Sequence, residues 1–252
     1  MKNKNFKDYF SDNSSAYATY RPSYPHKLVY ELSKICKNSH LALDCGCGTG
    51  QLSVLLAENF DLVVATDASQ SQIQNAEKKD NIIYKTAIAE NSGLEHKSVD
   101  LITVAQAAHW LDLESFYKEV KRISKENTIL ALITYGVLHV EGTVDKLIQE
   151  FYYTTIGSYW PKERKHVENG YANLPFPFHE LPFPKLNMEE FWNLEDLINY
   201  FNTWSAVKEA EKISGVNPTD QLRTNLQMLW GNPYSKKKII WPLSIRVGSV
   251  HV

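Results

Sequence analysis

The chain has 252 residues, 43% of them hydrophobic and 22% charged, which is typical of one large globular domain. Its formal net charge of −2 argues against a general electrostatic nucleic-acid binder, because such a protein is expected to be basic. No run approaches the ~20 apolar residues of a membrane-spanning helix, and the Lys-rich residues 1–10 lack the apolar stretch of a secretory signal. We therefore expect a cytoplasmic protein without a membrane partner, present as a monomer or a homodimer.

Apolar runs alternate with helical patterns in the first part of the chain. After a helix that begins at Pro25, short apolar runs predict strands over residues 41–44, 62–66, 82–85, 101–105 and 129–133. Apolar spacing and capping residues predict helices over residues 51–58 and 69–79 and after Asp112. Apolar strands that alternate with amphipathic helices indicate a parallel sheet covered on both faces.

The alternation ends after Gly136. Residues 157–184 are rich in Trp, Tyr, Phe and Pro, and this density of proline excludes a central strand or a helix interior. Helices are predicted over residues 144–151, 193–201 and 218–229, and residues 239–252 predict a closing strand. We therefore expect an α/β fold, with a Rossmann-like, doubly wound, mostly parallel sheet of about seven strands, an antiparallel last strand and a helical, aromatic cap insertion.

A glycine-rich turn follows the first predicted strand. Leu41–Asp44 leads into Gly46, Gly48 and Gly50, and a helical pattern begins at once. Strand, glycine turn and helix together indicate a nucleotide-type cofactor site. Gln51 occupies the position where a dinucleotide fingerprint has its third small residue, which departs from that pattern. The carboxylate of Asp44 is placed to order the amides of the turn or to meet a ligand ammonium.

Two of the three cysteines lie inside this turn. Cys45 and Cys47 form a C-x-C pair, and Cys36 is the third cysteine. A small, odd number of cysteines suits a reducing cytosol and offers no disulfide framework. No partner pair is evident, so we expect no metal site and interpret these cysteines as small residues that fill the turn.

The Asp44–Gly50 segment resembles the signature of class I S-adenosylmethionine-dependent methyltransferases. The resemblance covers residues 38–135 and implies S-adenosyl-L-methionine as the cofactor, held by Asp44, Gly46, Gly48 and Gly50. It also implies that Asp67, with Ala68 beside it, holds both ribose hydroxyls at the end of the second strand. A carboxylate suits that role because it accepts two hydrogen bonds at once.

Later strand ends extend the resemblance. Ala89 and Glu90 are similar to the family's Ala-Glu segment beside the adenine. Asp100–Gln106 resembles the fourth-strand motif, which implies that Gln106 lies under the sulfonium. The pair His109–Trp110 resembles the methyltransferase-11 type and makes His109 the candidate catalytic residue.

Two segments outside the core resemble a narrower group. Tyr20–Pro25 and Thr203–Ala206 look like the trans-aconitate methyltransferase-like subgroup and related fungal small-molecule methyltransferases. In such enzymes the lead-in segment closes over the cofactor. The resemblance implies that Tyr17 and Arg21 meet the methionyl carboxylate.

Structural roles remain open for several of these residues. Glu90 and Gln106 are also consistent with polar loop positions, Arg21 with a solvated side chain, and His109 with a structural histidine stacked on Trp110. For the cap aromatics, we expect most to form the core of a lid that shields the site; these residues are Tyr152, Trp160, Phe176, Phe178, Phe183 and Trp192.

The resemblance also implies a division of the chain. We expect a single methyltransferase domain over residues 1–252. Its parts are an N-terminal cover segment and helix (1–37), a cofactor-binding core (38–135), a cap insertion with late helices (136–238) and a closing strand (239–252).

The expected function is methyl transfer to a small-molecule carboxylate, hydroxyl or thiol by in-line displacement. A carboxylate or thiolate acceptor needs no general base, whereas a hydroxyl or an amine does, and His109 is then the first candidate. A nicotinamide-dependent oxidoreductase and a non-catalytic S-adenosylmethionine-binding protein are the alternatives. Transfer to RNA or protein is disfavoured by the absence of a basic patch, although Lys236–Lys238 forms a short basic run that also suits a solvated turn.

Overall fold

The computed structural model describes residues 20–251, so Tyr17 lies outside the described residues. The first part contains α2 (His26–Ile35), β1 (Leu41–Cys45), α3 (Gln51–Leu56), β2 (Leu62–Asp67), α4 (Gln70–Gln74), β3 (Ile82–Thr86), β4 (Val99–Ala105), η2 (Ala108–Trp110), α5 (Leu113–Ile123) and β5 (Ser124–Tyr135). The second part contains β6 (His139–Val140), α6 (Thr143–Glu150), η3 (Phe151–Thr155), η4 (Gly157–Tyr159), α7 (Arg164–Glu168), β7 (His179–Leu181), β8 (Asn187–Trp192), α8 (Leu194–Asn202), α9 (Ser205–Ser214), α10 (Pro218–Trp230) and β9 (Lys237–Ser249).

One mixed sheet organises the molecule, with the order β3-β2-β1-β4-β5-β9-β6. Strands β1 to β5 pair in parallel, and β9 runs antiparallel beside β5. The predicted α/β fold with an antiparallel last strand is therefore confirmed. Asp44 pairs with Ala65 of β2 and with Thr103 of β4, so the carboxyl ends of these strands meet at one edge, where open parallel sheets bind ligands.

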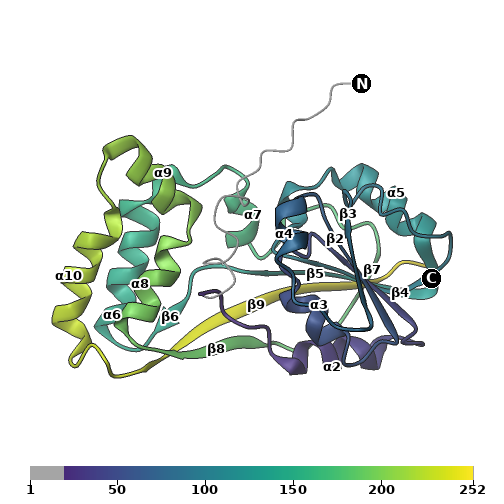
Figure 1. Ribbon diagram of the computed structural model, residues 1–252, viewed down its shortest axis with the longest axis horizontal. Helices are drawn as coiled ribbons and strands as arrows, with labels where there is room; N and C mark the ends of the chain where they lie inside the picture. The colour runs from purple at the N-terminus through teal and green to yellow at the C-terminus, as the bar shows by residue number, and fades with distance from the viewer. Residues whose placement is uncertain (1–19, 252) are drawn as a thin grey trace.

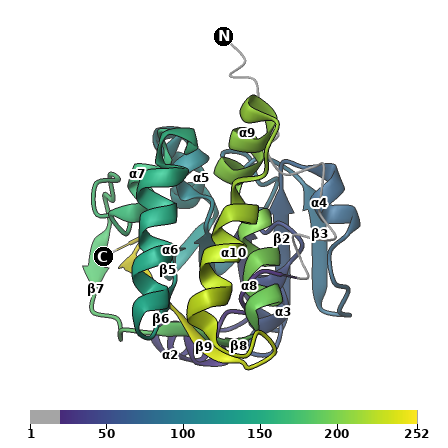
Figure 2. The same ribbon diagram turned by 90° about the vertical axis from the view of Figure 1, so that its left-hand side faces the viewer.

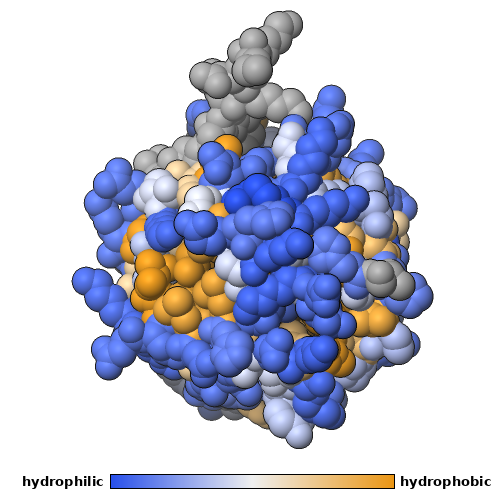
Figure 3. Space-filling view, turned by 90° about the vertical axis from the view of Figure 1, so that its right-hand side faces the viewer, coloured by the Kyte–Doolittle hydropathy of each residue, from blue (hydrophilic) through white to orange (hydrophobic). Residues whose placement is uncertain are grey.

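Helices cover both faces of the parallel strands, as the apolar strand sequences predict. Alternate residues of a strand point to opposite faces. Ala42 and Leu101 belong to the core cluster that contains Leu32 of α2, whereas Leu43 and Ile102 belong to the cluster that contains α5 residues. Figure 3 shows the outer surface on the right-hand side of Figure 1, which is mostly hydrophilic around a limited hydrophobic area.

The second part forms a cap beside the sheet. Helices α6, α8, α9 and α10 stand together at one end of the molecule, and β9 runs from the sheet to the base of these helices (Figures 1 and 2). There β9 pairs with β6 and β8. Buried aromatic rings form much of the cap interior; among them are Tyr152, Tyr200, Phe201, Trp204 and Trp241.

The cap aromatics named from the sequence mostly pack as core. Tyr152 is fully buried, Phe178 packs edge-on against Tyr117 of α5, and Trp192 packs against Trp241 of β9. Tyr152, with the partly buried Trp192 packed against the same cluster, agrees with the expected lid core, whereas Phe178 belongs to the core cluster on the α5 face of the sheet. Trp160 differs because it contacts both Tyr152 and a pocket described below.

Several boundaries differ from the predicted ones. Helix α4 ends at Gln74 rather than Lys79, because the amide of Glu77 donates to Thr49 O in the glycine turn at 3.3 Å instead of continuing the helix. Asp112 stands at the N-cap of α5, but its side chain makes no capping bond and accepts from Ser115 Oγ at 3.0 Å instead.

Two predicted helices of the cap, α8 and α10, begin close to their predicted first residues. Asn193 and Asp196 form a reciprocal capping box at the start of α8, and Pro218 occupies the first turn of α10. In contrast, the sequence does not predict α7, α9, β6, β7 or β8. Helix α7 lies within residues 157–184, in the part that precedes the proline-rich half of this segment. Strand β7 lies at the edge of the sheet, where prolines next to a strand are tolerated.

The described residues include neither a membrane-spanning helix nor a cluster of metal ligands. Over residues 20–251, no helix is long and apolar enough to cross a membrane. In the same range, no three or more His, Cys, Asp or Glu residues are grouped to hold a metal ion. Cys36, Cys45 and Cys47 are free thiols.

Candidate functional site

The glycine turn between β1 and α3 has a left-handed backbone at each glycine. Gly46, Gly48 and Gly50 have φ angles of +65°, +56° and +86°, which residues with a side chain rarely adopt. A Cβ at Gly46 would lie 2.6 Å from the Cβ of Ala107, and a Cβ at Gly50 would collide with the hydroxyl of Tyr84. The turn therefore requires glycine both for its conformation and for its packing.

Asp44, the acid before this turn, is 1% exposed. Its carboxylate accepts hydrogen bonds from Ser53 Oγ at 2.6 Å and Thr103 Oγ1 at 2.8 Å. Burial raises the pKa of Asp44 to about 6, although both hydroxyl donors act to lower it. Asp44 thus ties α3 and β4 to β1 behind the turn, and its described contacts are hydroxyl groups rather than loop amides.

Asp67 stands at the end of β2 beside the glycine turn. Its Oδ2 accepts from the amide of Gly48 at 2.9 Å and its Oδ1 from the amide of Ser69 at 2.8 Å. Ala68, the next residue, is partly exposed. These two bonds hold the carboxylate of Asp67 against the glycine turn at the end of β2.

Ala89 and Glu90 follow β3. Ala89 is buried in the core cluster on the α5 side of the sheet. Glu90 is partly exposed, and its Oε1 accepts from the amide of Asp112 at 2.9 Å. The segment is therefore fixed to the start of α5 at the same edge of the sheet as Asp67.

Gln106 follows β4 with a φ of +55°. Its Nε2 donates to Tyr135 O at 2.8 Å, and its Oε1 accepts from Thr134 Oγ1 at 2.7 Å. Its backbone amide donates to Ile133 O at 2.9 Å. Strained backbone persists where its surroundings over-determine it and is common at functional sites, and here three contacts to β5 hold Gln106 at the wall of a pocket.

His109 lies in η2 on the same pocket. Its Nδ1 is 2.8 Å from the hydroxyl oxygen of Tyr171, and its ring is tilted against Trp110 at 4.7 Å between centroids. Burial, followed by the positive charges of Arg164 and His166, lowers the pKa of His109 to about 3. The imidazole is therefore neutral at physiological pH and a weak base. The expected contact with Trp110 is present.

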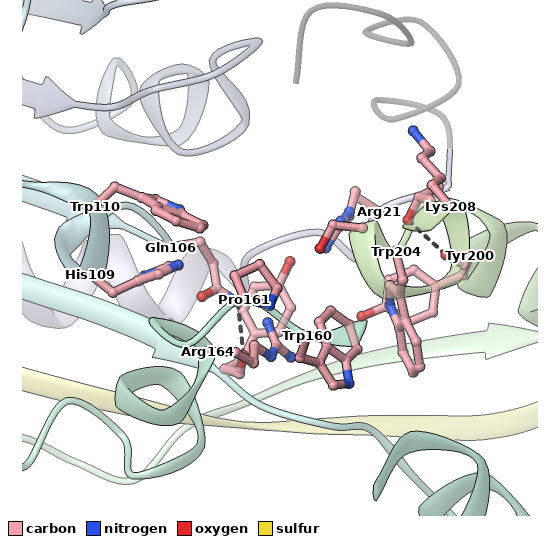
Figure 4. A pocket seen from close by; sticks show the side chains of 13 residues that line it. Arg21, Gln106, His109, Trp110, Trp160, Pro161, Arg164, Tyr200, Trp204 and Lys208 are labelled. Carbon is pink, nitrogen blue, oxygen red and sulfur yellow. Dashed lines mark hydrogen bonds between the residues drawn. The ribbon is translucent and has the colours of Figure 1, made fainter. Parts of the chain in front are cut away.

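The pocket lies between the end of β4 and the cap, and it encloses about 840 Å³ including its open mouth. Figure 4 shows its side chains converging from the two sides. Its aromatic walls are formed by His109, Trp110, Tyr135, Trp160, Tyr200 and Trp204. Its cations are Arg21, Arg164 and Lys208, and no Asp or Glu of the described residues lines it.

The structure brings together two sets of predicted residues. Asp44, Gly46, Gly48, Gly50, Asp67, Ala68, Ala89 and Glu90 gather at the carboxyl edge of the parallel strands. Gln106, His109 and Arg21 line the pocket, where the Arg21 guanidinium lies 5.6 Å from the centroid of the Tyr200 ring.

Other pocket residues were not predicted as site residues. Arg164 and Lys208 carry no local signal, because α7 and α9 were not predicted. Thr203, Trp204 and Ser205 line the pocket and belong to the Thr203–Ala206 segment that carried the subgroup resemblance, so this segment held an available signal for the site.

Known proteins resemble this chain over most of its length. A family model for the methyltransferase domain of the methyltransferase-11 type matches residues 43–132. A Dictyostelium discoideum protein named as a methyltransferase is 34% identical over 239 residues, which are 93% of this chain and 91% of that protein. A Saccharomyces cerevisiae protein named as an S-adenosylmethionine-dependent methyltransferase is 34% identical over 142 residues, which are 53% of this chain and 47% of that protein.

A solved structure agrees with these sequence matches. A protein from Anaeromyxobacter dehalogenans described as a type II methyltransferase is 39% identical, with a TM-score of 0.88, and the match covers 92% of this chain and 98% of that one. The similarity thus includes the cap as well as the parallel sheet. The chain belongs to the class I S-adenosylmethionine-dependent methyltransferases of the methyltransferase-11 type.

Proposed function

We propose that this methyltransferase acts on a carboxylate of a small organic acid. The observation that carries the proposal is the charge of the pocket: besides Arg21, two further cations, Arg164 and Lys208, line it, and no Asp or Glu of the described residues does. Guanidinium and ammonium groups bind carboxylates through charge-assisted hydrogen bonds. The aromatic walls favour an acceptor whose remaining surface is apolar or planar.

The residues at the strand ends fit the cofactor. A side chain at position 46 or 50 would collide with Ala107 or Tyr84, and the carboxylate of Asp67 lies beside the glycine turn, where it accepts from the amide of Gly48. We propose that Asp67 and the glycine turn hold the nucleoside and amino-acid parts, with Ala89 and Glu90 beside the adenine. In the same proposal Arg21, with Tyr17 outside the described residues, meets the methionyl carboxylate.

S-adenosylmethionine supplies an electrophilic methyl group on a sulfonium, so the protein's main task is to position the acceptor. Gln106 is fixed by Thr134 and Tyr135 at the end of β4 and forms the wall that faces the cap. The neutral His109 is suited to hydrogen bonding rather than to proton removal near neutral pH. A carboxylate is already ionised and needs no base, which favours it over a hydroxyl or an amine.

A narrower assignment to the trans-aconitate methyltransferase-like subgroup has some support. Its sequence resemblance includes Thr203–Ala206, and Thr203, Trp204 and Ser205 line the pocket. We propose that the cap insertion, residues 136–238, carries acceptor specificity within a single domain. We further propose that the enzyme works in the cytoplasm as a monomer or homodimer.

The alternatives fare differently. Membership of this family excludes the nicotinamide-dependent oxidoreductase. The basic run Lys236–Lys238 offers little support for an RNA substrate, since Lys237 lies over the Trp230 ring and Lys238 forms an ion pair with Glu189 at the start of β9. The same membership argues against a protein that binds the cofactor without transferring its methyl group.

The test is transfer of labelled methyl to a panel of aliphatic and aromatic carboxylic acids, trans-aconitate included, with the matching amides as controls. We expect products from acids and none from amides. The products are expected to release labelled methanol in alkali, because methyl esters hydrolyse there whereas methyl ethers, amines and thioethers do not. Alkali-stable products, or no product although S-adenosylhomocysteine raises the melting temperature, would refute the proposal.

A further inference from the structure

Arg164 is the first residue of α7 and is held by two aromatic residues. Its Nε donates to the hydroxyl of Tyr152 at 2.6 Å. Its guanidinium carbon lies 4.7 Å from the centroid of the Trp160 ring and 5.5 Å from that of Tyr152. The two rings and one hydrogen bond hold the guanidinium in place. This bond uses only the Nε–H, so it leaves the N–H groups of both Nη atoms for other contacts.

Within the part of the chain that the structure describes, Arg164 forms no direct ion pair. Among residues 20–251, no carboxylate lies within 4.0 Å of its guanidinium nitrogens. Glu168 is reached only through Tyr152, whose hydroxyl donates to Glu168 Oε1 at 3.2 Å. A fixed cation beside a pocket that no described Asp or Glu lines favours an anionic ligand.

Arg164 acts on the side of the pocket where the reaction is proposed. Figure 4 shows it toward Gln106 and His109, whereas Arg21 and Lys208 lie toward the cap helices. After burial, the positive charge of Arg164 is the next largest cause of the low pKa of His109. Both observations place the guanidinium close to the end of β4.

We infer that Arg164 is the specificity-determining residue that binds a carboxylate of the acceptor. This inference rests on the proposed function. Two guanidinium N–H groups form parallel hydrogen bonds with a carboxylate, and Trp160 and Tyr152 hold the fork in place before the acceptor binds. Helix α7 thereby selects acids over uncharged molecules of the same shape.

The test compares benzoate with benzamide, which have similar shapes and differ in charge. Calorimetric titration uses the full chain saturated with S-adenosylhomocysteine. We expect the wild-type protein to bind benzoate at least about tenfold more tightly than benzamide, as charge-assisted hydrogen bonds imply. Arg164→Gln removes this preference and leaves the affinity for benzamide unchanged. Lys165→Gln, a change at an exposed neighbour on the same helix, retains the preference.

A second variant is needed because Arg164→Gln also removes the hydrogen bond to Tyr152 and could thereby destabilise the fold. Arg164→Lys keeps the charge and loses the fork, so it binds benzoate several-fold more weakly than the wild type and binds benzamide equally. Melting temperature and S-adenosylhomocysteine affinity report whether each variant is folded. Unchanged benzoate affinity in either folded Arg164 variant would overturn the inference.

The two hypotheses fail in different ways. If the wild-type protein prefers benzoate but the Arg164 variants keep that preference, Arg164 does not bind the carboxylate and the proposed function stands, with Lys208 as the anion-binding residue. If the wild-type protein does not distinguish benzoate from benzamide, both the inference and the proposed carboxylate acceptor are wrong.

Discussion

The folded state is expected to lose stability in mild acid because of His109. Its pKa is lowered from 6.5 to about 3 by burial first and then by Arg164 and His166. His109 therefore binds a proton near pH 6.5 in the unfolded chain but stays neutral at that pH in the folded protein. A group whose pKa is depressed in this way, when its charged form is the protonated one, destabilises the fold as the pH falls.

The magnitude follows from the two pKa values. Between about pH 7.5 and pH 5, the proton bound only by the unfolded chain at His109 lowers the free energy of unfolding by about 2 kcal/mol. Urea unfolding of the wild type and of His109→Gln is to be measured at both pH values. The wild type should lose about 2 kcal/mol more than the variant over this interval, and Tyr171→Phe keeps most of the effect because it leaves the ring buried.

A single outcome would refute this reasoning. If wild type and His109→Gln lose the same free energy between the two pH values, His109 is protonated in the folded protein and is available as an acid or base. In that case the chemical argument for a carboxylate over a hydroxyl acceptor loses its support from His109. The m-value of each curve should stay constant, since a changed slope would indicate a different unfolding transition.

Three further predictions concern the cofactor edge. Asp67→Ala weakens S-adenosylhomocysteine binding at least about tenfold by calorimetry, whereas the control Asp61→Ala, at an exposed residue, does not. If Asp67→Ala and the wild type bind S-adenosylhomocysteine equally, the assignment of Asp67 to the ribose is wrong. Gly50→Ala lowers the free energy of unfolding, measured in urea, by about 2 kcal/mol or more. Adding Tyr84→Phe to this variant recovers part of the lost free energy. An unchanged unfolding midpoint in Gly50→Ala contradicts the close contact between Gly50 and Tyr84. Burial raises the pKa of the Cys47 thiol well above its usual value, so iodoacetamide modifies it much more slowly in the native than in the unfolded chain. Equal rates in the two states contradict the raised pKa of this thiol.

The parallel core is predictable from sequence because local patterns there agree with the tertiary structure. Leu62–Asp67 is an apolar run that becomes β2, and its final acid stands at the edge where the glycine turn begins. Parallel strands are buried on both faces, so each reads as a continuous apolar run. The ends of helices are less predictable, since α4 stops where Glu77 bonds to Thr49, a contact that no local pattern contains.

Gln106 and His109 of the pocket were predicted from the β4 end, but its cap side could not be predicted because those residues reach the pocket only through tertiary packing. Arg164 stands in a five-residue helix, which is too short to show an apolar period. Lys208 lies in α9, whose exposed face resembles any solvated helix. The sequence singled out Arg21 and Thr203–Ala206 by resemblance alone, and neither segment indicates that it borders the other.

The net charge of the chain does not predict the charge of this pocket. The chain as a whole carries a formal charge of −2, which excludes a broad electrostatic interaction with nucleic acid but says nothing about a single pocket. Arg21, Arg164 and Lys208 come from three separate segments and line one cavity. Because an ion acts most strongly at short range and away from water, we expect these local cations, rather than the net charge of the chain, to determine which ligands the pocket binds. A small acid can therefore be the preferred ligand of an acidic protein.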